Sequence, residues 1–187
     1  MSRFRLAAAV AALIAAFAAA ATQSPAASSC ANAEVTPTAK NQAKAADALL
    51  CLIQAARAER GLKKLTTSRA LGSAAGRFAA QMADRRFFSH TGPGGSTPCS
   101  RVKAAGYKNA ARVDEALGWG LRSSATPKEL LKTLTSDAQH RAIIFSAKLK
   151  DIGVGLAPEV PVKGEHEPGA TAVVDIARKG APGVRCR

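Results

Sequence analysis

The fold of this chain is constrained most by the order of its apolar patterns, which have helical spacing early in the chain and resemble strands near its end. Apolar residues recur at helical spacing from Asn41 to Gly61 and again from Leu71 to Met82. Later in the chain, residues 151–157 and 171–177 are short runs rich in β-branched residues, separated by a polar segment with proline and glycine. Helices followed by a late hairpin, with no regular βαβ alternation, predict an α+β domain with an antiparallel sheet.

Further helices are expected between these regions. The sequence TGPGGS interrupts the second helix soon after Arg85, because three glycines and a proline favour a loop. Thr97 can then cap a short helix that ends near Gly106. Thr126 and Glu129 have the spacing of a capping box and mark the start of a fourth helix. The stretch SDAQHRAIIF is predicted to form one more short helical segment.

The first residues predict export. Arg3 and Arg5 precede an apolar, alanine-rich run that ends in three small residues, the pattern of a cleavable signal peptide. The run is too short to be a good membrane-spanning helix, so we expect no transmembrane segment in the mature protein and a secreted or cell-envelope location. The expected division is a signal peptide at residues 1–21, a flexible arm at 22–40 and a single domain at 41–187.

Charge and aromatic content narrow the expected partners. The 187-residue chain has 27 basic and 13 acidic residues, and removal of Arg3 and Arg5 leaves 25 basic residues, a net charge of about +12 that favours anionic lipid or envelope polymer. The bases are scattered along the chain, and with one Trp and one Tyr they form no stripe with stacking aromatics, so nucleic acid is not an expected partner. The length fits one domain, which we expect to be monomeric.

Four cysteines in an exported chain predict two disulfides. No CxxC spacing suggests a metal cluster, and the sequence allows three pairings of Cys30, Cys51, Cys99 and Cys186. A bond from Cys30 to Cys51 would join the N-terminal arm to the first helix and leave Cys99 to hold the C-terminal tail through Cys186. The alternatives are lipidation of Cys30 and a nucleophilic Cys99.

The three histidines lie in different surroundings. His90 stands in FFSHTGPGGSTPC, between two phenylalanines and the glycine loop, whereas His166 falls in the polar segment between the two late strands, where a solvated turn residue is expected. His140 follows Asp137 by three residues, which places both on one face of a helical turn. Asp137 is equally suited to cap the turn that carries His140.

Several motifs, taken in order, resemble a known family. They are ADALLCLIQAARAERGLKKL, FFSH before the glycine loop, RVKAAGY, an acidic residue before GWG, and SDAQHRAIIF followed closely by IGVG. This series is similar to the bacterial branch of the CAP superfamily, also called SCP, which includes cysteine-rich secretory proteins, antigen 5 proteins and pathogenesis-related proteins. The resemblance covers about residues 46–178. It implies a three-layer α-β-α sandwich with a central antiparallel sheet and a cleft.

The same resemblance implies a set of cleft residues. By position, His90, Glu115 and His140 match the two histidines and the glutamate of the family, and Asp137 stands where the eukaryotic proteins carry a second acid. Two imidazoles and two carboxylates would suit Zn²⁺ or another divalent metal. Asp114 and Ala116 replace the glycine and asparagine that flank the family's glutamate, so the expected ligand specificity is altered.

Three functional hypotheses follow. The first is a secreted, non-catalytic binding module whose His/acid cleft holds a divalent metal and binds lipid or an envelope glycan. The second is a hydrolase of peptide, ester or cell-wall substrates, which depends on the metal or uses Glu115 as general base. The third is a cationic envelope protein with a vestigial cleft. The absence of GxSxG and HExxH motifs favours the first.

Overall fold

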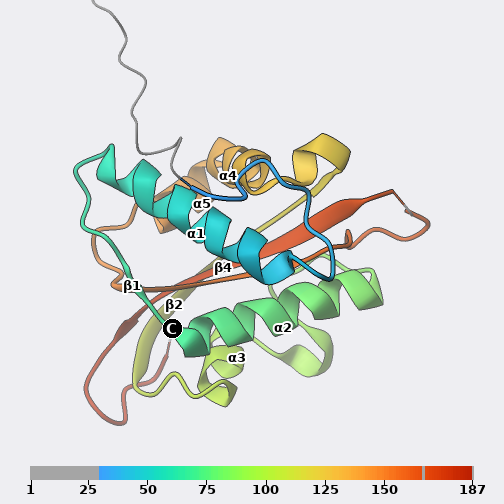
Figure 1. The fold of residues 1–187 in the computed structure, drawn as a ribbon. Coiled ribbons are helices and arrows are strands. Elements are labelled where there is room, and N and C mark those ends of the chain that lie inside the picture. The colour runs from blue at the N-terminus through green and yellow to red at the C-terminus, as the bar shows by residue number, and fades with distance from the viewer. Residues whose placement is uncertain (1–29, 166, 187) are drawn as a thin grey trace, which may run out of the picture.

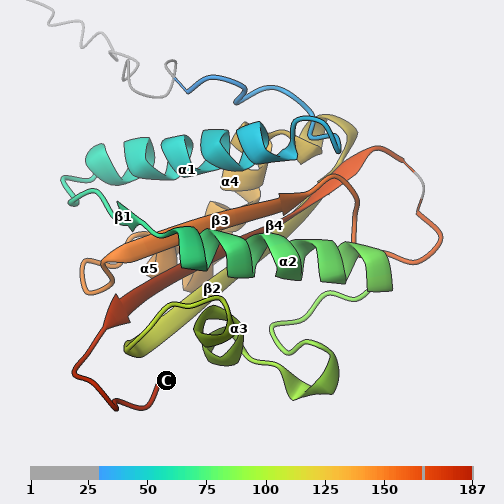
Figure 2. The ribbon, with the colours of Figure 1, turned by 60° about the horizontal axis from the view of Figure 1, so that its bottom comes forward.

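A computed structural model describes residues 30–165 and 167–186, so the predicted signal peptide and the arm up to residue 29 lie outside the described residues. Within them, one sheet lies between two layers of helices (Figures 1 and 2). α2 and α3 cover one face, and α1, α4 and α5 cover the other. The elements are α1 (Gln42–Ala58), β1 (Thr66–Thr67), α2 (Arg69–Arg85), α3 (Pro98–Ala104), β2 (Ala110–Leu121), α4 (Pro127–Ser136), α5 (Ala138–Ile144), β3 (Asp151–Ala157) and β4 (Gly169–Lys179).

The sheet has the strand order β1-β3-β4-β2. β4 pairs antiparallel with β3, as predicted for the late hairpin, and on its other side it pairs antiparallel with β2. β1 pairs parallel with β3 at Asp151 and Ile152. The α-β-α sandwich predicted from the sequence is confirmed, and its sheet is mixed because the connection from α1 to α2 runs for two residues alongside β3. β1 is too short to have a recognisable period.

Side-chain caps begin four of the helices, three of them at residues that the sequence suggested. Ser68 accepts a hydrogen bond from the amide of Leu71 at the start of α2, and Thr97 forms a complete capping box with Ser100. Thr126 accepts from Glu129 and begins α4. Asp137 begins α5, as described below with the site.

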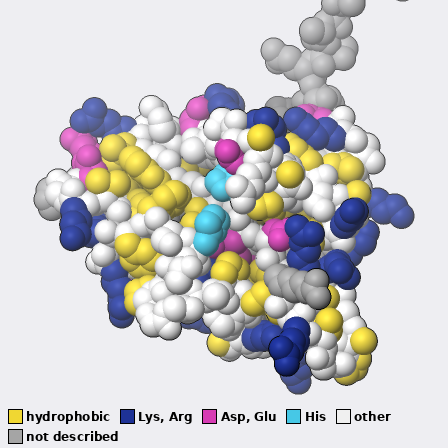
Figure 3. Space-filling view, turned by 180° about the vertical axis from the view of Figure 1, so that it is seen from behind, with side chains coloured by type: hydrophobic (Ala, Val, Ile, Leu, Met, Phe, Trp, Pro, Cys, Tyr) yellow, Lys and Arg dark blue, Asp and Glu magenta, His cyan; other side chains and the backbone are white. Residues whose placement is uncertain are grey.

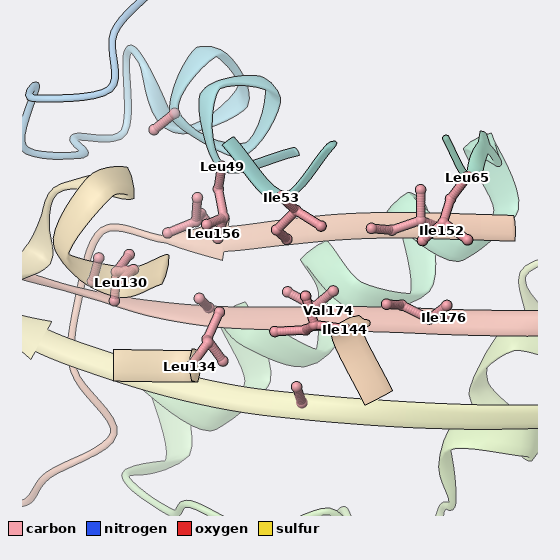
Figure 4. Close-up of a cluster of buried hydrophobic side chains, with 14 of the residues drawn as sticks. Leu49, Ile53, Leu65, Leu130, Leu134, Ile144, Ile152, Leu156, Val174 and Ile176 are labelled. Atoms are coloured by element: carbon pink, nitrogen blue, oxygen red, sulfur yellow. The ribbon is translucent and has the colours of Figure 1, made fainter. Parts of the chain in front are cut away.

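The larger core lies between the sheet and the layer of α1, α4 and α5 (Figure 4). Leu49 and Ile53 of α1 point toward the sheet, and Leu134 of α4 approaches it from the same side. On the opposite face, α2 lies directly on the backbone of β3. A Cβ atom added at Gly153 or Gly155 would lie 2.1 Å from a backbone nitrogen of α2, so only glycine permits this approach.

Both predicted disulfides are present and join Cys30 to Cys51 and Cys99 to Cys186. The first attaches the segment before α1 to α1 itself, and the second attaches the C-terminal tail to α3. All four cysteines are therefore oxidised, which excludes a free Cys99 thiol in this structure. Among the described residues, no helix is both long and apolar enough to cross a membrane.

Candidate functional site

The loop after α2 presents His90 at the surface. α2 ends where Arg86 adopts a left-handed conformation, which turns the chain away from the helix axis. Phe87 then packs edge-to-face against Phe78 of α2 and fixes the start of the loop. The amide of Gly92 donates to the carbonyl of Ser96 and closes the glycine turn. The His90 side chain between these anchors is half exposed.

Glu115 lies beneath His90 on β2, with a side chain that is fully buried. Nδ1 of His90 forms a hydrogen bond of 2.8 Å with Oε1 of Glu115. The other carboxylate oxygen, Oε2, accepts a hydrogen bond of 2.6 Å from Nη2 of Arg101. Both oxygens of the acid are therefore engaged, one by the imidazole and one by a guanidinium.

Arg101 on α3 connects the acid with the loop. Besides Glu115, it donates to the backbone carbonyls of His90 at 3.0 Å and Ser96 at 2.9 Å. Its guanidinium carbon lies 3.4 Å from the ring centroid of Phe78, within the range of a cation-π contact. One side chain thus positions the backbone of the loop and neutralises the buried acid. Arg101 was not among the predicted site residues, although RVKAAGY belongs to the series of motifs.

Asp175 adds a second buried acid. It lies on β4 directly opposite Glu115 in the strand register and is 1% exposed. Its Oδ1 has no hydrogen-bond partner among the described residues. Burial, and then the charge of Glu115, raise the pKa of Asp175 well above its usual value, while Arg101 opposes the shift. Asp175 was predicted only as part of a strand. The signal in the sequence that could have identified it is a single acidic residue within the apolar run TAVVDIA.

His140 and Asp137 approach the same face from α5. Oδ1 of Asp137 accepts a hydrogen bond of 2.8 Å from the backbone amide of His140, so Asp137 is the N-cap of α5. Nδ1 of His140 lies 3.9 Å from the same oxygen. Burial lowers the pKa of His140, Asp137 opposes this effect, and His90 adds to the lowering through its own charge. Figure 3 shows histidine side chains next to each other on this face, with acidic side chains beside them.

Comparison with known proteins identifies the family. The cysteine-rich secretory protein (CAP) family matches residues 50–160, more than half of the chain. The chain belongs to the CAP family. No curated protein sequence matches this CAP domain.

Two solved structures share the CAP fold of this chain. An extracellular protein with an SCP domain from Bacillus anthracis has a TM-score of 0.60 at 17% identity, over 76% of this chain and 44% of that protein. An outer surface protein from Borrelia burgdorferi has a TM-score of 0.58 at 18% identity, over 71% of this chain and 90% of that protein. Both likenesses concern the fold.

The four expected metal ligands differ in their availability within this CAP domain. Glu115 is engaged by Arg101 and His90, and Asp137 caps α5. Across residues 30–165 and 167–186, no group of three or more His, Cys, Asp or Glu side chains could hold a metal ion. Of the four, His90 alone has a carboxylate bonded to one ring nitrogen, which orients its other nitrogen toward a ligand; Nδ1 of His140 lies 3.9 Å from Asp137, beyond hydrogen-bond distance.

Proposed function

We propose that this CAP protein is an exported, non-catalytic binding module whose ligand contacts the imidazoles of His90 and His140. The observation that carries the proposal is the state of Glu115: its side chain is fully buried and both of its oxygens are engaged. The buried acid holds His90 in place, and the half-exposed imidazole faces outward. An exposed imidazole whose orientation is fixed by a buried carboxylate is suited to contact a ligand.

A hydrolytic role is less well supported by the same geometry. A general base needs a free oxygen within hydrogen-bond distance of the substrate or its attacking water. Oε2 of Glu115 accepts a hydrogen bond from Arg101 and Oε1 is bonded to His90, so neither oxygen is free for a substrate or water. We therefore assign Glu115 the role of a positioning residue for His90.

The ligand class follows from the two imidazoles. Neutral imidazole nitrogens bind Zn²⁺ and similar divalent ions, and the lowered pKa of His140 keeps its ring neutral at physiological pH. A metal held by His90 and His140 alone would keep open positions, which a phosphate or hydroxyl oxygen of an envelope lipid or glycan can occupy. Two supporting features for export are the predicted signal peptide and the two disulfides, which persist in oxidising compartments.

Calorimetric titration of Zn²⁺ into the purified domain tests the proposal. The unmodified protein is expected to bind with one saturable site, and His90→Ala and His140→Ala are each expected to weaken binding by at least about tenfold, the loss of one ligand. His166→Ala serves as the matched control and should leave the affinity unchanged. Equal affinity in all four proteins would refute a site at His90 and His140.

A further inference from the structure

The outer edge of β3 is only partly paired. β1 reaches it through two backbone hydrogen bonds, from Thr66 to the carbonyl of Lys150 and from Ser68 to the carbonyl of Ile152, both of 2.8 Å. Because alternate residues of a strand present their backbone groups to the same side, Val154 is the next residue to face this edge. In the described chain, no backbone segment pairs with β3 on this side beyond Ile152.

A groove follows this unpaired edge between α1 and α2, the two helices that flank β3 in Figure 2. It consists of three hollows of about 470, 340 and 260 Å³. Asp47 lines all three, and Gly72 and Val154 line both smaller ones, so the hollows are continuous. The backbone of β3 at Gly153 and Val154 contributes to the lining.

The walls of the groove are made of small side chains where they face Val154. α1 contributes Ala43 and Ala46, and α2 contributes Gly72 and Gly76. A Cβ atom at Gly76 would meet no atom within 4 Å, and one at Gly72 would lie 3.7 Å from the carbonyl oxygen of Val154. The space beside the free carbonyl is therefore open to another backbone, and a larger residue in α2 would fill it.

The charge around the groove favours an acidic occupant. Lys64 lines the largest hollow and Arg69 the next, against one acidic residue among those described, Asp47, which lines all three. The whole chain has a formal net charge of +14, so its long-range field attracts polyanions. An edge of unpaired N–H and C=O groups is complementary to an extended peptide backbone, which no acyl chain can match.

We propose that an extended peptide segment with acidic side chains binds in this groove and extends the sheet along β3 beyond β1. The incoming backbone pairs with Val154, and Lys64 and Arg69 attract its carboxylates. This site lies on elements that do not carry His90 or His140, and it functions independently of them.

The test uses a fluorescently labelled, capped peptide of alternating glutamate and valine, about six residues long, which spans ~20 Å when extended. Its binding is followed by fluorescence anisotropy. The unmodified protein should bind it with a saturable curve, and Gly76→Leu, which fills the groove, should weaken binding by at least about tenfold. Ala104→Leu, a similar enlargement on exposed α3, should bind within about twofold of the unmodified protein.

Two further measurements separate strand pairing from other modes. A peptide methylated at every backbone nitrogen has no N–H group on either edge, so it cannot form the strand ladder and should not bind. In the unmodified protein, the peptide should slow hydrogen exchange at the amides of Val154 and Leu156, while His90→Ala should bind it normally. The proposal is overturned by equal binding of the methylated peptide, by Gly76→Leu binding as well as Ala104→Leu, or by no saturable binding. Fatty acid competing for the groove in place of the peptide would indicate a lipid site and contradict it.

Discussion

Arg101 is the residue on which the histidine site depends most. Its guanidinium is the positive group bonded to the buried carboxylate of Glu115, and it also holds the loop that carries His90. Nδ1 of His90 bonds the other carboxylate oxygen, but that ring is half exposed. Arg101 therefore neutralises the acid that positions the imidazole, and it also anchors the loop that carries the imidazole.

Replacing Arg101 should consequently destabilise the fold as well as the site. Arg101→Met keeps much of the side-chain volume but leaves Glu115 buried without its cation, which should lower the free energy of unfolding by about 3–5 kcal/mol. Arg101→Lys keeps the charge and should cost less. Urea denaturation followed by circular dichroism measures both. A loss no larger for Met than for Lys would show that the charge of Arg101 is not what stabilises Glu115.

Asp175 should make stability depend on pH. Its pKa is raised in the folded protein, so the folded state keeps a proton that the unfolded chain loses above about pH 4. Its contribution is fully present below the unfolded pKa and is lost as pH rises toward the folded pKa. Asp175→Asn cannot ionise and should avoid this loss, so its advantage over the unmodified protein should grow by up to ~1.4 kcal/mol per pH unit in that window. Urea midpoints from pH 4 upward measure the difference, and a constant difference would contradict the shift.

The helices were easier to predict from the sequence than β2, the strand that carries Glu115. Caps and apolar periods mark helix starts within a short stretch of sequence, and Thr97 and Thr126 cap where expected. β2 was not predicted because it is buried on both faces for much of its length, so AARVDEALGWGL shows no clean alternation. Glu115 was placed in the site by family resemblance alone.

The remaining members of the site depend on pairing between distant segments. Asp175 joins Glu115 only through the register of β2 with β4, and Arg101 reaches Glu115 from another element. No local pattern encodes such contacts. Asp137, by contrast, has a role that the local sequence does encode. It caps α5, one of the two roles that the sequence allowed for it.

The contact between α2 and β3 gives a matched pair of glycine variants. Gly155→Ala places a methyl group 2.1 Å from the backbone nitrogen of Gly76, so α2 must move and the free energy of unfolding should fall by about 1–3 kcal/mol. Gly76→Ala adds its methyl group in open space within a helix and should raise that free energy by about 0.5–1 kcal/mol. Thermal unfolding of the two variants checks the sign of each change in the free energy of unfolding. A stabilising effect of Gly155→Ala would contradict the close packing of α2 on β3.

At the scale of the whole molecule, the two disulfides restrain the unfolded chain to different extents. The Cys30–Cys51 bond spans 21 residues, and the Cys99–Cys186 bond spans 87. The entropy of loop closure then predicts that removing the longer link, with both cysteines replaced by serine, costs about 1.3 kcal/mol more than removing the shorter one. Urea unfolding of the two double variants measures this difference, and an equal or reversed order would show that native-state contacts decide the outcome.

His90 and His140 come to one face of the molecule from elements in opposite layers, and we propose that they bind one ligand together. The most direct measurement is a titration of Zn²⁺ followed by the imidazole nitrogen resonances of all three histidines. We predict that His90 and His140 shift along one binding curve at the same Zn²⁺ concentrations while His166 does not follow it. Separate curves for His90 and His140, or a response confined to His166, would contradict a shared site at His90 and His140.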